Sequence, residues 1–325
     1  MTTSETAHRR NALMLVLAAA CWGGGTVVSK QAVAEVPPLT LLLIQLAISV
    51  AFLLVVTRLR GERLPTGREG RLLGRLGLLN PGFAYALSLI GLTQITASLS
   101  VLLWAGEPIL ILALAALVLG ERVGSAILAP TVVAIAGLGL VVFDPAASGS
   151  LFGVGLTIAG VVACAIYTVA TRRWLLGTDS TFGVVLAQQM HALGLALVVV
   201  VALALTGGGV LPERLTLAGI ASASVSGLLY YSLAYSFYLS ALRSVRASVA
   251  AASFYLVPVF GVVAGWFVGE RLQPLQWLGA LLVIASVAAI TIRIARPVDE
   301  SPSDQPSSVP ASTQTAIAPR SSTLR

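Results

Sequence analysis

Long apolar stretches alternate with short polar connections along almost the whole chain. A helix needs about 20 predominantly apolar residues to cross the hydrocarbon core of a bilayer. Ten stretches meet this requirement: 11–33, 38–57, 72–92, 95–119, 124–143, 151–171, 181–205, 216–241, 247–268 and 275–294. The pattern therefore predicts an all-α integral membrane protein with ten transmembrane helices joined by short connections.

The two ends of the chain depart from this pattern. Residues 298–325 are rich in Ser, Pro, Thr and Gln and lack apolar periodicity, which predicts a disordered cytoplasmic tail. Residues 1–10 form a polar N-terminus, and their basic residues followed by an apolar run up to Cys21 resemble a secretory signal. Because the apolar run continues past Cys21 and another span follows, we expect an uncleaved first helix.

Charge is scarce and unevenly placed. Charged residues make up 10% of the chain, whereas soluble domains carry about 25%, so a water-soluble fold is excluded. With the N-terminus placed in the cytoplasm, the arginines of 58–75 and most others fall in cytoplasmic connections, and the outer side receives Lys30, Arg214 and Arg271. This positive-inside bias predicts that both termini are cytoplasmic, and it argues against a nucleic-acid-binding surface.

The two halves of the sequence resemble each other. The segment 97–108, which runs from Ala-Ser to Pro, aligns with 247–258, and the Gly-Glu-Arg of 120–122 returns at 269–271. Each half holds five predicted helices, so the second half enters the membrane from the opposite side. Inverted repeats of this kind are typical of secondary transporters, although duplication in another class of membrane protein would leave the same trace.

Several residues carry a resemblance to a known family. Trp22-Gly23, Lys30 late in the first helix, Pro38 opening the second helix and the two repeated blocks are similar to the drug/metabolite transporter superfamily. Within it, the chain resembles the EamA-type ten-helix transporters over about residues 11–295. The resemblance implies two inverted five-helix repeats, 11–143 and 151–295, around a central cavity in the bacterial plasma membrane.

The resemblance also implies a function. We expect export of a small organic solute, such as an amino acid, nucleoside, related metabolite or drug, by alternating access driven by protons or by exchange. The expected partners are this solute and the lipid bilayer, with no nucleic acid, and a homodimer is left open. The family often has an arginine where this chain has Gln45, so recognition through that arginine is not expected here.

Two rival functions remain. A lipid-modifying membrane enzyme would need clustered catalytic groups, and the short loops offer no such cluster of His, Asp or Cys. A non-transporting sensor would need a folded soluble domain. Cys21 and Cys164 lie in apolar runs without metal-ligand spacing, so we expect a protein that is not an enzyme and that has neither a metal nor another cofactor.

Glu107 is the strongest candidate for a residue that acts directly in transport. It precedes Pro108 near the predicted bilayer midplane, where an ionisable group costs about 2.5–3.5 kcal/mol and is a functional candidate by default. Helical spacing would place Ser100, Trp104 and Glu107 on one face. We expect Glu107 to line the cavity and to couple transport to protons, the alternative being a protonated carboxyl packed against a neighbouring helix.

Other candidates are cations and tyrosines inside apolar helices. Lys30 shares a face with Trp22 and either faces the cavity or extends to the outer headgroups. Tyr231, Tyr235 and Tyr238 form a stripe that either lines the cavity or anchors the helix at the membrane interface.

A last group contains polar or aromatic side chains with weaker signals. As cavity candidates we name Gln45, Tyr85, Gln188, His191 and Tyr255, with Asn80 as a further polar residue of the same kind. Glu121 and Glu270 lie in turns, and we expect them to cap or pair at helix ends.

Overall fold

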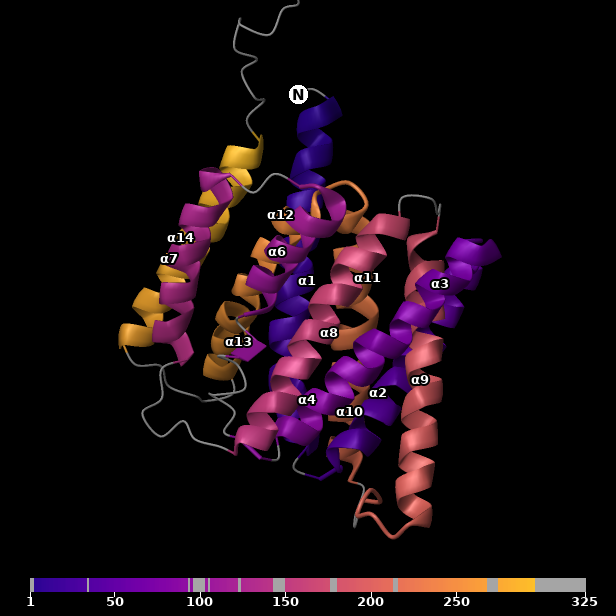
Figure 1. Cartoon of the computed structure of the whole chain (residues 1–325). Coiled ribbons are helices and arrows are strands. Elements are labelled where there is room, and N and C mark those ends of the chain that lie inside the picture. Colours follow the sequence, from indigo (N-terminus) through magenta and orange to yellow (C-terminus); the bar gives the residue numbers. More distant parts are fainter. Residues whose placement is uncertain are drawn as a thin grey trace, which may run out of the picture.

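The computed structural model describes residues 3–33, 35–92, 94–95, 103–104, 106–121, 124–142, 150–175, 180–212, 216–267 and 274–295. The first half contains α1 (Thr3–Val33), α2 (Pro38–Leu59), α3 (Gly67–Gly77), η1 (Leu78–Phe83), α4 (Ala84–Leu92), α6 (Glu107–Leu119) and α7 (Ser125–Val142). The second half contains α8 (Leu151–Leu175), α9 (Thr181–Leu205), α10 (Leu217–Gly227), η2 (Leu228–Leu233), α11 (Ala234–Leu242), α12 (Ala247–Ala252), η3 (Ser253–Tyr255), α13 (Leu256–Phe267) and α14 (Pro274–Ala295). Every one of these elements is a helix, which confirms the all-α fold class (Figure 1).

Six helical runs are long and apolar enough to cross a membrane: 9–33, 38–59, 151–175, 181–205, 217–242 and 247–267. Shorter apolar helices cover 107–119, 127–137 and 277–289. Each of the ten predicted stretches contains a helix, and α9 begins and ends at the predicted residues. The number of ten membrane crossings stays a prediction.

The internal repeat extends to local structure. The run α3–η1–α4 and the run α10–η2–α11 begin and end at positions 150 residues apart, and each is interrupted at the same place by a segment of six residues. In η2 this segment is a π-helical turn, whereas in η1 it is a kink at Asn80, whose backbone is not helical. A π-helical turn is rare and interrupts an α-helix. The two halves therefore share not only residues but also the position at which one helix of each half is interrupted.

A second interruption lies before each repeated proline, and it differs from our expectation. Glu107 is the first residue of α6, not a residue in the middle of one continuous helix, and Pro108 lies in the first turn. Proline is favoured there because the first turn needs no N–H donor and the fixed φ of proline suits a helix start. In the second half, α12 and the 3₁₀ turn η3 precede α13 and its Pro258 in the same way. The two prolines thus begin helices inside the apolar stretches.

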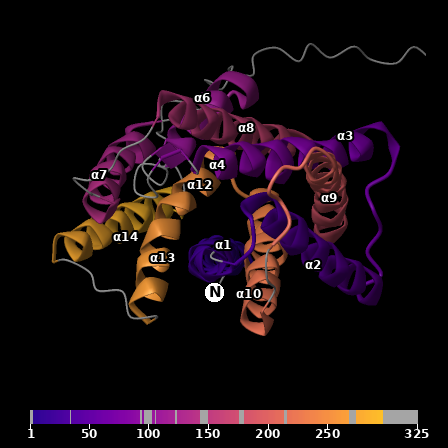
Figure 2. The same cartoon turned by 90° about the horizontal axis from the view of Figure 1, so that it is seen from below.

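Helices of the two halves interleave. α1 packs against α10, α11 and α13, whereas α8 packs against α4 and α6 (Figure 1). α2 lies along α9, and α7 pairs with α14 at one edge of the bundle (Figure 2). The start of α1 and the end of α14 lie on the same side of the bundle (Figure 1).

Two glycines allow the halves to meet closely. Gly77 is the last residue of α3, and a Cβ added to it would lie 1.9 Å from the Gln188 carbonyl oxygen in α9. Gly227 is the last residue of α10, and a Cβ added to it would lie 2.8 Å from the Gln45 carbonyl oxygen in α2. Small residues serve this role in membrane helices, where close packing drives association. Gly77 directly precedes η1 and Gly227 directly precedes η2, so these contacts hold α3 and α10 against helices of the opposite half.

Candidate functional site

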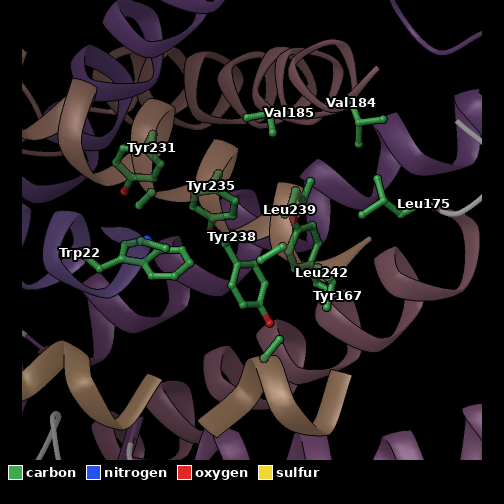
Figure 3. Close-up of a cluster of buried hydrophobic side chains, with 14 of the residues drawn as sticks. Trp22, Tyr167, Leu175, Val184, Val185, Tyr231, Tyr235, Tyr238, Leu239 and Leu242 are labelled. Carbon is green, nitrogen blue, oxygen red and sulfur yellow. The ribbon is translucent and has the colours of Figure 1, made fainter. Parts of the chain in front are cut away.

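Tyrosines of η2 and α11 gather around one tryptophan of α1. Trp22 meets Tyr235 and Tyr238 edge-on, with ring centroids 5.5 Å apart in both pairs, and Tyr231 stacks parallel to Tyr235 (Figure 3). All four side chains are buried. The tyrosine stripe therefore faces α1 inside the bundle, and the alternative of a membrane-interface belt does not describe it.

Both halves contribute further rings to the same assembly. Tyr85 of α4 stacks on Trp104 at 5.7 Å and meets Tyr230 edge-on at 5.5 Å. Phe254 of η3 lies 5.3 Å from Trp22, and Tyr167 of α8 lies 6.2 Å from Tyr235. We call this assembly the aromatic cluster; its members are Trp22, Tyr85, Trp104, Tyr167, Tyr230, Tyr231, Tyr235, Tyr238 and Phe254.

Glu107 lies beside the aromatic cluster with a side chain that is 6% exposed. The Cys164 thiol lies next to its carboxyl group, and the Tyr230 and Tyr238 hydroxyls are close enough to interact with it electrostatically. Among the described residues, Glu107 Oε1 accepts no hydrogen bond. Native proteins satisfy most buried polar atoms, so an unsatisfied carboxylate oxygen needs an explanation.

Two neighbouring donors are unsatisfied as well. Trp22 Nε1 and the Tyr238 hydroxyl are buried, and neither forms a hydrogen bond with a described residue. Thr168 lies close to the Tyr238 hydroxyl but does not meet hydrogen-bond geometry. An acceptor and two donors thus lie unpaired at one aromatic surface, which is the arrangement expected where a polar ligand binds.

A layer of satisfied polar groups supports the aromatic cluster. Asn80 of η1 donates from Nδ2 to Cys164 Sγ at 3.1 Å and accepts at Oδ1 from the Tyr235 hydroxyl at 3.1 Å. The Tyr167 hydroxyl donates to Gln188 Oε1 at 2.8 Å. These bonds fix the tilt of two cluster rings, so Asn80 and Gln188 act by positioning aromatic side chains.

Gln45 holds helices together. Its Nε2 donates to Ser29 Oγ at 2.9 Å and to Ser226 Oγ at 2.8 Å, which joins α2 to α1 and α10. Both amide hydrogens are therefore used within the protein. Gln45 therefore acts in packing α2 against α1 and α10.

Other candidates lie away from the aromatic cluster. His191 is exposed, its Nδ1 pairs with the Ala187 carbonyl at 2.7 Å, and its ring packs against Gly74 of α3. Tyr255 is buried in a separate apolar cluster with Ala19. The structure therefore does not bring these two side chains to the site that we expected them to line.

Lys30 and Ser100 cannot be assigned to the site. The backbone of Lys30 belongs to α1, two helical turns or about 12 Å beyond Trp22, and its side chain lies outside the described part of the chain. Ser100 lies outside the described residues.

Several members of the site are not among the candidates that the sequence singles out. Tyr167 and Phe254 lie in apolar stretches without a polar stripe. Tyr230 precedes Tyr231 but does not belong to the stripe, and Cys164 lies in an apolar run. Their positions follow from which helices meet, so no spacing within one helix could reveal them. No group of three His, Cys, Asp or Glu side chains that could hold a metal occurs among the described residues.

The expected central cavity is closed in this conformation. Trp22, Tyr235, Tyr238 and Glu107 are all at most 6% exposed, so side chains fill the space between the two halves where they are described. A surface hollow of about 400 Å³ lies elsewhere, on α3. A solute could reach the aromatic cluster only after helices of the two halves have moved apart.

Two sequence matches decide the family. The pattern of the EamA-like transporter family matches residues 9–143 and matches again over residues 151–292. The chain belongs to the EamA-like transporter family. It is accordingly a multi-pass membrane transporter of the drug/metabolite transporter superfamily, built from two copies of the family unit.

Individual proteins are similar to the chain over most of its length. The chain is 28% identical to an uncharacterized protein of Pseudomonas aeruginosa over 286 residues, which covers 87% of this chain and 94% of that protein. It is 25% identical to an uncharacterized transporter of Archaeoglobus fulgidus over 287 residues, covering 86% of this chain and 97% of the relative. One crystal structure matches with a TM-score of 0.73 and 18% identity, covering 87% of this chain and 96% of that one, which shows a shared fold.

Proposed function

We propose that this EamA-family transporter exports a small organic solute by alternating access, and that protons and solute compete for Glu107. The observation that carries the proposal is the unsatisfied carboxylate oxygen of Glu107 beside the aromatic cluster. A buried carboxylate is costly unless it is protonated or paired with a cation or donor. Binding of either a proton or the solute therefore removes the free-energy cost of burying the charged Glu107 carboxylate.

Competition of this kind couples the inward movement of protons to the outward movement of the solute. When the site faces the outside, a proton binds Glu107 and the solute leaves; when it faces the cytoplasm, the proton leaves and a solute binds. Each cycle would move a proton inward and a solute outward through one site. The inverted repeat supports the required pair of conformations, because each half can take the role of the other.

The aromatic cluster constrains the solute. Ring faces bind apolar or aromatic groups and attract cations within about 6 Å, whereas the carboxylate favours a positive or hydrogen-bond-donating group. None of the aromatic residues that define the cluster carries a charge that could pair with Glu107. We therefore propose a solute that bears an amino group next to an apolar or aromatic portion, such as an amino acid or an amine-containing drug.

Uptake into everted membrane vesicles tests this function. Vesicles containing wild type, Glu107→Gln or Glu69→Gln would be given a mixed metabolite library, with and without an inside-acid gradient, and accumulation would be read by mass spectrometry. Glu69→Gln is the matched control, because Glu69 is an exposed carboxylate of α3 that does not contact the aromatic cluster in any described interaction.

Each outcome has a consequence. Gradient-driven accumulation of amine-bearing compounds by wild type and Glu69→Gln, lost in Glu107→Gln, is the expected result. Equal accumulation by all three proteins would leave transport standing and remove Glu107 from it. If no compound moves in wild type, the export function itself is contradicted.

A further inference from the structure

Helix α3 has two opposite faces. Gly74 and Gly77 lie on the buried face, where a Cβ would come within 3.1 Å of the His191 ring and 1.9 Å of the Gln188 oxygen of α9. Leu73 is also fully buried on this side. This face therefore packs against the bundle and fixes the direction in which the other face points.

The opposite face is lined by arginines. Arg68, Arg71 and Arg75 follow one another at intervals of three and four residues, which places them within roughly 60° of arc on an α-helix. All three are exposed, and with Leu72 they border the hollow of about 400 Å³. Because they lie on the side away from α9, they face the surroundings of the protein.

The protein does not neutralise this charge within the part of the chain that the structure describes. The nearby acidic residue Glu62 pairs with Arg60 at 3.2 Å and accepts hydrogen bonds from Ser180 and the Phe182 N–H. Glu69 lies about 100° around the helix from Arg68 and forms no described ion pair with it. Arg68, Arg71 and Arg75 thus have no ion-pair partner among the described side chains.

The depth of these arginines matches a lipid headgroup layer. The uncharged part of this segment, from Leu76 to Leu92 with a kink at Asn80, would span at most roughly 26 Å of a hydrocarbon core that is about 30 Å thick, so the charged turns before Leu76 lie at its edge. The first turns therefore extend beyond the core, and Arg75 can reach the same layer by extending its aliphatic stem. The positive-inside bias puts this end of the helix at the cytoplasmic surface.

We propose that Arg68, Arg71 and Arg75 bind the phosphate of an anionic phospholipid in the cytoplasmic leaflet. Arginine presents several donors in a planar fork that suits phosphate oxygens, and three of them surround one hollow. Leu72 is 37% exposed beside them and offers an apolar contact to the glycerol and acyl portion. The occupant is a lipid and not free phosphate, because the three arginines lie at the depth expected for headgroups and the site includes this apolar contact.

Lipid titration of the full-length protein tests the site. Purified protein in detergent micelles would be titrated with dioleoyl phosphatidylglycerol, dioleoyl phosphatidylethanolamine or inorganic phosphate, and bound lipid would be counted by native mass spectrometry. The triple variant Arg68→Gln/Arg71→Gln/Arg75→Gln would be compared with Arg10→Gln/Arg58→Gln/Arg173→Gln, which loses the same charge at exposed arginines on three other helices.

Wild type and the control variant should bind phosphatidylglycerol on the order of 10- to 100-fold more tightly than phosphatidylethanolamine. The α3 triple variant should lose this preference. Equal losses in both triple variants, or no preference in wild type, would overturn the proposal, and displacement of the lipid by millimolar phosphate would point to a free-anion site. If the α3 triple variant does not fold, Arg71→Gln against Arg173→Gln makes the same comparison with one charge.

Discussion

The carboxylate of Glu121 caps α12 at its first two residues, Ala247 and Ser248. Its Oε2 accepts hydrogen bonds from the Ser248 N–H at 3.1 Å and from the Ser248 hydroxyl at 2.5 Å, and its Oε1 accepts from the Ala247 N–H at 2.9 Å. Glu121 follows Gly120, whose φ of 67° ends α6. The capping role expected for Glu121 is thus present, and it joins the first repeat to the second. Glu270 lies outside the described residues.

Loss of this cap should destabilise the protein. We expect Glu121→Ala to lower the free energy of unfolding by about 1.5–3 kcal/mol, because the free helix N–H groups of α12 lose a charged acceptor. Thermal unfolding in detergent should show a melting temperature lowered by at least about 3 °C. Glu69→Ala is the control, and equal shifts in both variants would contradict the role of the cap.

Close packing at the interrupted helices makes a second prediction. Gly77→Ala and Gly227→Ala should each reduce the yield of monodisperse protein in size-exclusion chromatography, because the added methyl group would overlap the backbone of Gln188 or Gln45. Gly24→Ala is the matched control, since a Cβ there meets nothing within 4 Å. A normal yield for Gly77→Ala would show that η1 and α9 do not approach as described.

Removing two tyrosine hydroxyls one at a time should distinguish an effect on solute binding from an effect on stability. Tyr167→Phe removes a hydrogen bond to Gln188 and should lower the free energy of unfolding by about 1 kcal/mol. Tyr238→Phe removes a hydroxyl without a described partner, so it should leave the melting temperature unchanged and raise the KM for a transported solute. The reverse assignment of the two effects would exclude Tyr238 from solute binding.

Cys164 can report whether the aromatic cluster opens. It is buried between Asn80 and Glu107, so in a Cys21→Ser background it should react with N-ethylmaleimide at least about tenfold more slowly than a cysteine placed at exposed Thr206. Addition of a transported solute should change the Cys164 rate and leave the rate at residue 206 unchanged. A Cys164 rate equal to that at residue 206 without solute would show that the closed arrangement is not the resting one.

The pattern of hydrophobic residues alone predicted much of the fold. Polar residues bound the apolar stretches sharply, which is why α9 begins and ends where the sequence predicts. The kink in η1 lies at Asn80-Pro81-Gly82, a helix-breaking sequence that a criterion of apolar length alone does not detect. The turn η2 escaped prediction because its residues are as apolar as the helices around it. In lipid, an apolar side chain fits a helix interior and a helix break equally well.

The candidate site was predictable only in part. Glu107, Trp22 and the three tyrosines of the stripe stood out because polar or large amphipathic groups are rare in such helices. The faces of α4 and α8 could not be derived, since a helix that is apolar all round gives no direction toward its neighbours. Cys164 and Tyr167 join the site only through contacts between helices, and His191 leaves it for the same reason.

The π-helical turn η2 sets the rotational register of the aromatic rings that follow it in α11. Such a turn holds one residue more than the α-helix around it, and one residue corresponds to about 100° of rotation. Deleting a residue from η2 would therefore swing Tyr235 and Tyr238 away from Trp22 while leaving every side chain of the cluster chemically intact. One surplus residue in η2, and not a contact within the cluster, decides which way these two rings point.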